Sequence, residues 1–100
     1  MGMTTTEQVI ESTRRYIAEN FLYARPDFVV GERDSLLGRG IVDSLGVMEI
    51  VEFLATEFGV VAEDDDMTEQ NFGTLAGIAR FVVFKSTSAA ETAEPVNAEA

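Results

Sequence analysis

The amino-acid sequence predicts an all-α fold, a small antiparallel four-helix bundle of three main helices and one short helix. Apolar residues recur at three- and four-residue steps in three separate segments, which is the spacing of one helix face. The two strand-like runs, 60–61 and 81–84, are too short and lack flanking hairpin turns. With 100 residues, the chain has room for one domain at most.

The first helix is expected over residues 6–20. Either Thr4 or Thr6 can cap it, and Thr4 and Glu7 have the spacing of a capping box. Its inward stripe is predicted from the side chains that recur at helical spacing, namely Val9, Ile10, Thr13, Tyr16, Ile17 and Phe21.

A long loop over residues 22–42 follows the first helix. Its start at Arg25-Pro26 disfavours helix, and three glycines punctuate the rest. Loops of this length are uncommon in small domains unless they are functional or pinned to the core. Five apolar side chains are expected to pin it, namely Phe28, Val29, Leu36, Leu37 and Ile41.

The second helix is expected over residues 44–58 and should stop at Gly59, a natural left-handed terminator. A helical wheel predicts an inward face of Val47, Val51, Leu54 and Phe58, flanked by Met48, Ile50 and Ala55. The same wheel places the following side chains toward the other side: Leu45, Glu49, Glu52, Phe53 and Thr56.

Beyond the second helix, an acidic loop at 63–66 leads to a short helical turn at 68–72 and a last helix at 74–84. The last helix should turn Leu75, Ile78, Ala79, Val82 and Val83 inward. The folded domain is therefore expected over 6–85. The ends, 1–5 and 86–100, are expected to be disordered, because the long C-terminal stretch has no aromatic residue and no apolar periodicity.

The formal net charge of −11 argues against nucleic acid and anionic membranes as partners. Nine acidic residues and no basic residue fall within 40–79. This acidic region either steers a basic partner or serves solubility alone. We expect a cytoplasmic monomer without membrane insertion, because no apolar stretch is long enough to span a bilayer and no secretory signal is visible.

The residue inventory argues against an enzyme and against a metal site. The chain has no histidine and no cysteine, and its only lysine, Lys85, is far along the last helix. Read as a calcium loop, the acidic run from Asp64 fails, because Glu69 stands where the loop needs glycine and Leu75 where it needs glutamate. Acidic residues before a short helix instead complement its dipole.

One serine stands out as a site of chemistry. Ser44 opens the second helix, where unpaired backbone N–H groups and a partial positive charge favour a phosphate. The tripeptide at 43–45 occurs a second time at 34–36, but there Leu37-Gly38-Arg39-Gly40 follows, which cannot start a helix. The following helix, and not the tripeptide, distinguishes Ser44 from Ser35.

The chain resembles the acyl carrier protein family over about residues 6–85. The run Gly40-Ile41-Val42-Asp43-Ser44-Leu45 resembles the family's phosphopantetheine attachment motif, and the Asp34-Ser35-Leu36 copy fits the Ser-Leu anchor often found in the family's long first loop. The second helix also resembles the family's pattern, at Val47, Glu49, Ile50, Val51, Leu54, Glu57, Phe58 and Gly59. The later helices resemble it through the acidic stretch before Met67 and through Phe72, Thr74, Leu75, Ile78 and Phe81.

The resemblance implies a covalent 4′-phosphopantetheine on Ser44, flanked by Asp43 and Leu45 and added by a phosphopantetheinyl transferase. The arm's thiol would carry acyl groups as thioesters between enzymes of fatty-acid, lipid or polyketide-type synthesis. The other implied partners are a ligase, synthase or acyltransferase with a basic docking patch. The residues expected to meet them are Leu45, Glu49, Glu52 and Phe53.

Three residues depart from the family pattern and indicate a specialised carrier. Gly46 stands where many members have an acidic residue, Glu52 where an apolar one is frequent, and Phe53 where a small one is common. Phe53 is either an exposed anchor for a partner or packs against the long loop. Two other functions stay open: an aminoacyl or peptidyl carrier serving a stand-alone ligase, and an acidic helical interaction module without an arm, in which Ser44 is only a helix cap.

Overall fold

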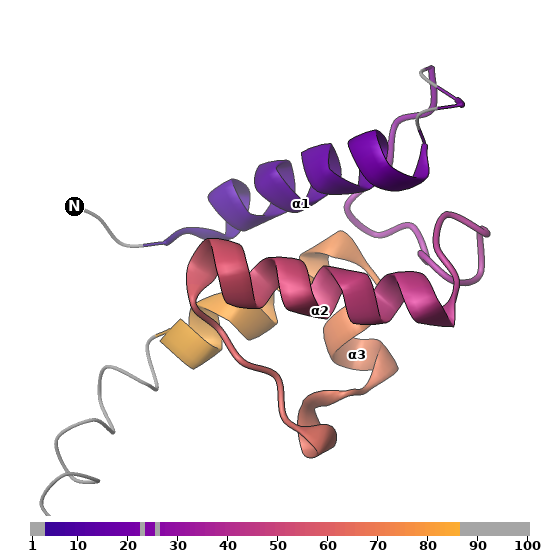
Figure 1. Cartoon of the computed structure of the whole chain (residues 1–100). Helices are drawn as coiled ribbons and strands as arrows, with labels where there is room; N and C mark the ends of the chain where they lie inside the picture. The colour runs from indigo at the N-terminus through magenta and orange to yellow at the C-terminus, as the bar shows by residue number, and fades with distance from the viewer. Residues whose placement is uncertain (1–3, 23, 26, 87–100) are drawn as a thin grey trace, which may run out of the picture.

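The computed structural model describes residues 4–22, 24–25 and 27–86, which form an all-α fold. Its elements are α1 (Thr6–Phe21), α2 (Ser44–Phe58), the 3-10 helix η1 (Asp64–Asp66) and the short α3 (Glu69–Phe72). A further helix over residues 75–86, without a label in Figure 1, follows α3. The predicted all-α bundle of three main helices and one short helix, with a long connection after the first, is confirmed.

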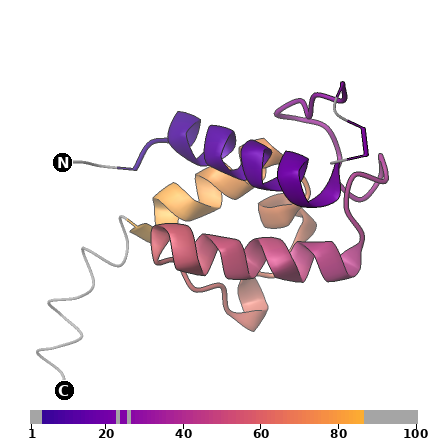
Figure 2. The same ribbon diagram turned by 45° about the horizontal axis from the view of Figure 1, so that its top comes forward.

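The helices surround one apolar core. In Figures 1 and 2, α1 and α2 run antiparallel, and the helix over 75–86 ends near the end of α2. The core draws buried side chains from every main helix and from the long loop: Val9, Ile10, Ile17, Leu22, Val30, Leu36, Ile41, Val42, Ile50, Leu54, Val60, Phe72, Leu75, Ile78, Ala79, Phe81 and Val82. Among the described helices, none is both long and apolar enough to cross a membrane.

The N-terminus of α1 is capped one residue away from either predicted position. The Thr5 hydroxyl accepts the backbone N–H of Gln8 at 3.1 Å, and the Gln8 side chain accepts the N–H of Thr5 at 3.0 Å. This reciprocal pair is a capping box. The prediction of Thr4 or Thr6 as the cap was wrong, because each of the three consecutive threonines offers the same hydroxyl. The residue that completes the capping box is Gln8 and not the predicted Glu7. The helix also ends at Phe21, one residue later than expected.

The long loop is pinned by backbone hydrogen bonds as well as by side chains. Leu36 donates its N–H to the carbonyl oxygen of Gly73 at 2.8 Å, and its own carbonyl accepts the N–H groups of Ile41 and Val42 at 2.9 and 3.1 Å. Glu32 accepts the N–H of Ala76 at 2.9 Å, which ties the loop to the start of the last helix. The loop is therefore fixed to the α3 end of the bundle.

Two of the five predicted loop anchors were wrong. Val29 is 75% exposed and Leu37 is 48% exposed, whereas Leu36 and Ile41 are buried as expected. Val30 is buried in place of its neighbour Val29. Without a regular backbone period, the sequence does not show which of two adjacent apolar residues faces inward.

Helix α2 has the predicted bounds but a different central row. Gly59 ends the helix with a φ of 70°, a left-handed conformation that glycine adopts without steric cost. The buried residues are Gly46, Ile50 and Leu54, while Val47, Val51 and Phe58 are only half-buried and Met48 is exposed. Two neighbouring rows of apolar residues run along this helix, and the row that faces the core is the one that begins at Gly46.

The C-terminal part also follows the prediction with small differences. Thr68 caps α3 by accepting the N–H of Asn71 at 3.2 Å. In the helix over 75–86, Phe81 is buried and Val83 only half-buried. The two ends predicted to be disordered are 1–5 and 86–100. Most of their residues lie outside the part that the structure describes, which includes only Thr4, Thr5 and Ser86 from these ends.

Candidate functional site

Ser44 is the first residue of α2, and its side chain is exposed. The cap of this helix is Asp43, whose Oδ1 accepts the backbone N–H of Gly46 at 2.7 Å. Within the described part of the chain, the Ser44 hydroxyl has no hydrogen-bond partner. The serine therefore has no capping role, and its hydroxyl is free for chemistry.

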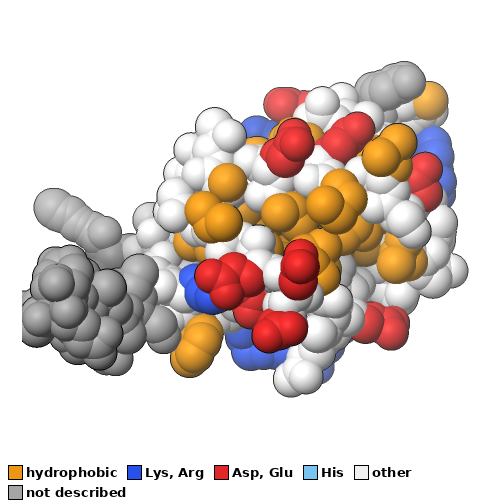
Figure 3. Space-filling model, turned by 60° about the horizontal axis from the view of Figure 1, so that its bottom comes forward, with side chains coloured by type: hydrophobic (Ala, Val, Ile, Leu, Met, Phe, Trp, Pro, Cys, Tyr) orange, Lys and Arg blue, Asp and Glu red, His pale blue; other side chains and the backbone are white. Residues whose placement is uncertain are grey.

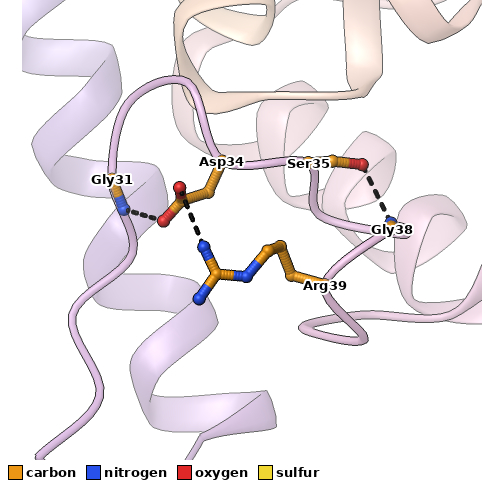
Figure 4. A network of polar contacts seen from close by, with 5 residues as sticks. All are labelled: Gly31, Asp34, Ser35, Gly38 and Arg39. Carbon is orange, nitrogen blue, oxygen red and sulfur yellow. Dashed lines mark hydrogen bonds and ion pairs between the residues drawn. The ribbon is translucent and has the colours of Figure 1, made fainter.

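Ser35, in the second copy of the tripeptide, is engaged in the loop. Figure 4 shows its hydroxyl accepting the backbone N–H of Gly38, at 2.9 Å. The neighbouring Asp34 accepts the N–H of Gly31 at 2.8 Å and pairs with Arg39 at 3.2 Å. No helix follows Ser35, as the sequence predicts, and its hydroxyl has a structural role that the Ser44 hydroxyl lacks.

Two grooves flank Ser44. The loop-side groove has a volume of about 610 Å³ and is lined by Phe21, Leu37, Gly40, Ile41, Val42, Asp43, Ser44, Leu45, Gly46 and Glu49. The α3-side groove has a volume of about 430 Å³ and is lined by Leu37, Ser44, Val47, Met48, Met67, Thr68, Glu69, Phe72 and Gly73. Leu37 and Ser44 belong to both linings.

The α3-side groove is the more apolar of the two. Figure 3 shows hydrophobic side chains gathered between α2 and the η1–α3 segment, with acidic side chains on both sides of them. Its lining includes two thioethers, from Met48 and Met67, and the ring of Phe72, with Glu69 as its one carboxylate. Such a surface suits a flexible apolar chain.

Gly46, which stands where many members of the resembled family have an acidic residue, is buried in the first turn of α2. A Cβ at this position would approach Cε1 of Phe21 to 2.9 Å and Cβ of Val42 to 3.0 Å. The ring of Phe21 therefore packs against the first turn of α2 where a side chain would otherwise stand. Glycine at this position therefore avoids a steric conflict with Phe21 and Val42.

The predicted docking residues divide into two groups. Leu45, Glu49 and Glu52 are exposed on α2, with Leu45 at 70%. Phe53 is half-buried and stacks on Tyr16 of α1 with ring centroids 4.4 Å apart. This contact with Tyr16 was not anticipated, because the sequence does not show which residue of α1 lies opposite Phe53.

Two exposed apolar side chains near Ser44 were missed as surface residues. Met48 is 50% exposed and Leu37 is 48% exposed, and both line the α3-side groove with Ser44. A sequence signal existed for Met48, which stands four residues after Ser44 and so lies on the same helix face. Leu37 comes from the loop, where no period predicts its position.

The electrostatics near α2 are negative. Burial, together with the charges of Glu49 and Glu52, raises the pKa of Tyr16 above its ordinary value of 10.0. Neither groove has a basic residue in its lining. Farther along the chain, hydrogen bonding from the Glu63 backbone and the nearby Lys85 ammonium lower the pKa of Asp66, whose Oδ2 lies 3.2 Å from Lys85 Nζ.

Residues 64–66 form η1, and Asp66 accepts the N–H of Glu63 at 2.9 Å. Among the described residues, no group of three or more His, Cys, Asp or Glu side chains is arranged to hold a metal ion. The site around Ser44 therefore consists of a free hydroxyl, two adjacent grooves and an acidic helix face.

No protein-family model and no curated protein sequence matches this chain.

Proposed function

We propose that this chain is an acyl carrier protein whose prosthetic arm, 4′-phosphopantetheine, is attached to the hydroxyl of Ser44. The carrying observation is that Asp43 caps α2, which leaves the Ser44 hydroxyl exposed at the meeting point of two grooves. The resemblance of the Asp43-Ser44-Leu45 run to an attachment motif supports the same residue.

The residues around Ser44 fit such a group. The first-turn N–H groups of Ser44 and Leu45 have no acceptor within the helix and point toward the helix N-terminus, where a phosphodiester is stabilised. The carboxylate of Asp43 opposes a phosphate there, so the covalent bond, and not charge, holds the group in place. When attached, the arm supplies the thiol that this cysteine-free chain lacks.

The α3-side groove favours an acyl cargo over an aminoacyl one. Its wall of Val47, Met48, Met67 and Phe72 removes hydrocarbon from water at a gain of about 0.8 kcal/mol per CH₂. An aminoacyl group carries an ammonium, which loses its hydration in such a groove. The cargo class is therefore an apolar acyl chain of fatty-acid, lipid or polyketide-type synthesis.

Partner enzymes with a basic docking patch are expected to bind the exposed acidic face of α2 at Glu49 and Glu52. The partners are the phosphopantetheinyl transferase and the synthases, ligases or acyltransferases that load and unload the arm. Transfer between them requires fast and weak docking. An interaction module without an arm would leave the exposed Ser44 hydroxyl without any role, since Asp43 performs the capping.

The mass of the protein after modification tests this proposal. The full chain is incubated with coenzyme A and a broad-specificity phosphopantetheinyl transferase, then weighed. We expect the mass gain of one phosphopantetheine, lost in Ser44→Ala and retained in Ser35→Ala, the matched serine of the other tripeptide. The absence of any gain with several transferases, or an equal gain in Ser44→Ala, contradicts the proposal.

A further inference from the structure

Two arginines of the long loop share one aromatic ring. The guanidinium carbon of Arg25 lies 4.4 Å from the ring centroid of Phe28, and that of Arg39 lies 5.9 Å from the same centroid. Phe28 is half-buried and packs against the core, so the ring that both cations contact is fixed in the fold. Cation–π contact holds a guanidinium in place while its N–H groups remain available to a partner.

The backbone of both arginines is hydrogen-bonded. Arg25 donates its N–H to the carbonyl of Leu22 at 2.8 Å, and its own carbonyl accepts the N–H of Phe28 at 3.0 Å. Arg39 donates its N–H to the carbonyl of Ser35 at 2.9 Å. Both arginines are nevertheless exposed, so this loop presents two positioned cations, the arginine pair, to solvent.

The charge of the arginine pair is only partly neutralised. Asp34 lies 3.2 Å from Arg39, as Figure 4 shows, while its other carboxylate oxygen accepts the N–H of Gly31. Arg25 has no ion pair within the described part of the chain, and Asp27 is not within ion-pair distance of it. Two cations beside one ring repel each other, so an anion from outside the chain stabilises the pair.

Charges of both signs lie around Ser44. Arg39 directly precedes Gly40, which lines the loop-side groove together with Ser44, whereas Glu49 and Glu52 are exposed on α2. Figures 1 and 2 show the long loop at the end of the molecule where α2 begins. An enzyme that covers Ser44 and reaches both the loop and α2 therefore meets cations at one and carboxylates at the other. Such an arrangement fixes the orientation of the enzyme.

The phosphopantetheinyl transferase is the partner that must reach the Ser44 hydroxyl itself. It therefore has to cover the surface beside the start of α2, whereas enzymes that act on the thiol meet their reacting group an arm's length away. Nucleic acid and anionic membranes are poor occupants, because the net charge of −11 repels an extended polyanion. A few carboxylates on an otherwise basic enzyme surface avoid this repulsion.

We propose that Arg25 and Arg39 are a docking site for Asp or Glu carboxylates of the phosphopantetheinyl transferase, beside the basic patch that this enzyme presents to α2. The inference rests on the proposed carrier function and adds a contact of opposite sign to the same partner. Contacts between exposed opposite charges are individually weak, and salt weakens them further. The arginine pair therefore orients a complex that still dissociates quickly.

The kinetics of Ser44 modification test this docking site. Initial rates are measured by mass for the full chain with a broad-specificity transferase and saturating coenzyme A. In Arg25→Glu with Arg39→Glu, we expect the KM for the carrier to rise roughly five-fold or more while kcat stays unchanged. The matched control, Arg15→Glu with Arg80→Glu, makes the same change of net charge at exposed positions of α1 and the last helix. Its KM should stay equal or fall, because a more acidic carrier attracts a basic enzyme more strongly.

A binding measurement without turnover gives a second readout. The unreactive Ser44→Ala chain is titrated with the transferase, and its backbone amide signals are followed. We expect changes at Arg25, Phe28 and Arg39 as well as along α2, and changes confined to α2 contradict the inference. If Arg25→Glu with Arg39→Glu does not fold, the neutral pair Arg25→Gln with Arg39→Gln replaces it, and a KM equal to that of the natural chain is then the contradicting result.

Other results also overturn the inference. A raised KM for coenzyme A with an unchanged KM for the carrier would assign the arginine pair to the phosphates of the coenzyme. Amide shifts at Arg25 and Arg39 that depend on the concentration of the carrier alone would assign the pair to a second copy of the chain. An equal rise of KM in the control would show that net charge, and not position, is responsible. Natural kinetics in the arginine variant overturn this inference and leave the carrier function standing, whereas no modification of the natural chain overturns both.

Discussion

Asp43 and Gly46 form the hydrogen bond that begins α2, with Oδ1 of Asp43 accepting the Gly46 N–H at 2.7 Å. This bond assigns capping to the aspartate and leaves the serine between them without a structural task. Two neighbouring residues of the tripeptide thus have separate roles, and their substitutions should have separate effects.

The first prediction concerns stability at this cap. Asp43→Ala should lower the free energy of unfolding by about 1 kcal/mol, because it leaves a first-turn N–H without its acceptor. Ser44→Ala should change it by less than about 0.5 kcal/mol. Chemical denaturation measures both, with Thr5→Ala at the α1 cap as the positive control. A Ser44→Ala loss equal to that of Asp43→Ala would falsify the assignment.

The second prediction concerns Gly46. Gly46→Ala should destabilise the protein by about 1 kcal/mol, although alanine is the better helix former by a similar amount, because overpacking costs roughly 1–3 kcal/mol. The conflict is with the ring of Phe21, 2.9 Å from the added Cβ. In a Phe21→Leu background, the cost of Gly46→Ala should fall by more than half in thermal or chemical unfolding. Additive effects of the two substitutions would contradict this packing.

The third prediction concerns the titration of Tyr16. Its pKa is raised by burial and then by Glu49 and Glu52, so Glu49→Gln and Glu52→Gln should each lower it, while Glu7→Gln should not. The pKa of Tyr16 is higher in the folded chain than in the unfolded chain. The contribution of neutral Tyr16 to the free energy of unfolding is therefore complete below about pH 10 and is lost as the pH rises through the folded pKa. Phenolate absorbance in a Tyr23→Phe background measures it. No response to either glutamine would refute the electrostatic cause.

The fourth prediction concerns docking. Reversing Glu49 and Glu52 to lysine should slow modification of Ser44 about ten-fold or more at low ionic strength, because steering by the acidic face is lost. Added salt should lower the rate at which Ser44 of the natural protein is modified, and it should reduce the difference in rate between the natural protein and the double variant. The control reverses Glu7 and Glu19, two exposed glutamates of α1. Equal rates for the two double variants would show that the α2 face does not steer partners.

The fifth prediction concerns Thr13, which is buried with its hydroxyl unpartnered among the described residues. Thr13→Val replaces that hydroxyl with a methyl of similar size and should raise the free energy of unfolding by about 1 kcal/mol. Thr56→Val, at an exposed position of α2, serves as the matched control and should have little effect. A destabilised Thr13→Val would indicate that the hydroxyl has a partner after all.

Much of the fold could be predicted from helical period and terminal residues alone. The bounds of α2 follow from Asp43 before it and Gly59 after it, since both act within one turn of the chain. The distinction between Ser44 and Ser35 has the same local origin, because it depends on whether a helix follows.

The remaining features depend on which elements meet. The stacking of Phe53 on Tyr16, the burial of Gly46 under Phe21 and the exposure of Leu37 are set by the packing of distant segments. Either of two adjacent rows of apolar residues on α2 could face the core, and the packing of the other helices determines which of them does. These features, which the sequence did not predict, lie beside the two grooves and at the α1–α2 contact.

The hydrogen bond between Leu36 and Gly73 has a consequence for when the surroundings of Ser44 take their final shape. It joins the segment leading into α2 to a junction formed late in the chain, next to the last helix. A partly synthesised or partly folded chain lacks this bond, so the loop segment that precedes Ser44 is not yet fixed in place. Under the carrier function proposed above, an enzyme that recognises Ser44 in its folded setting would modify only completely folded molecules, so that the arm would mark chains whose folding is complete.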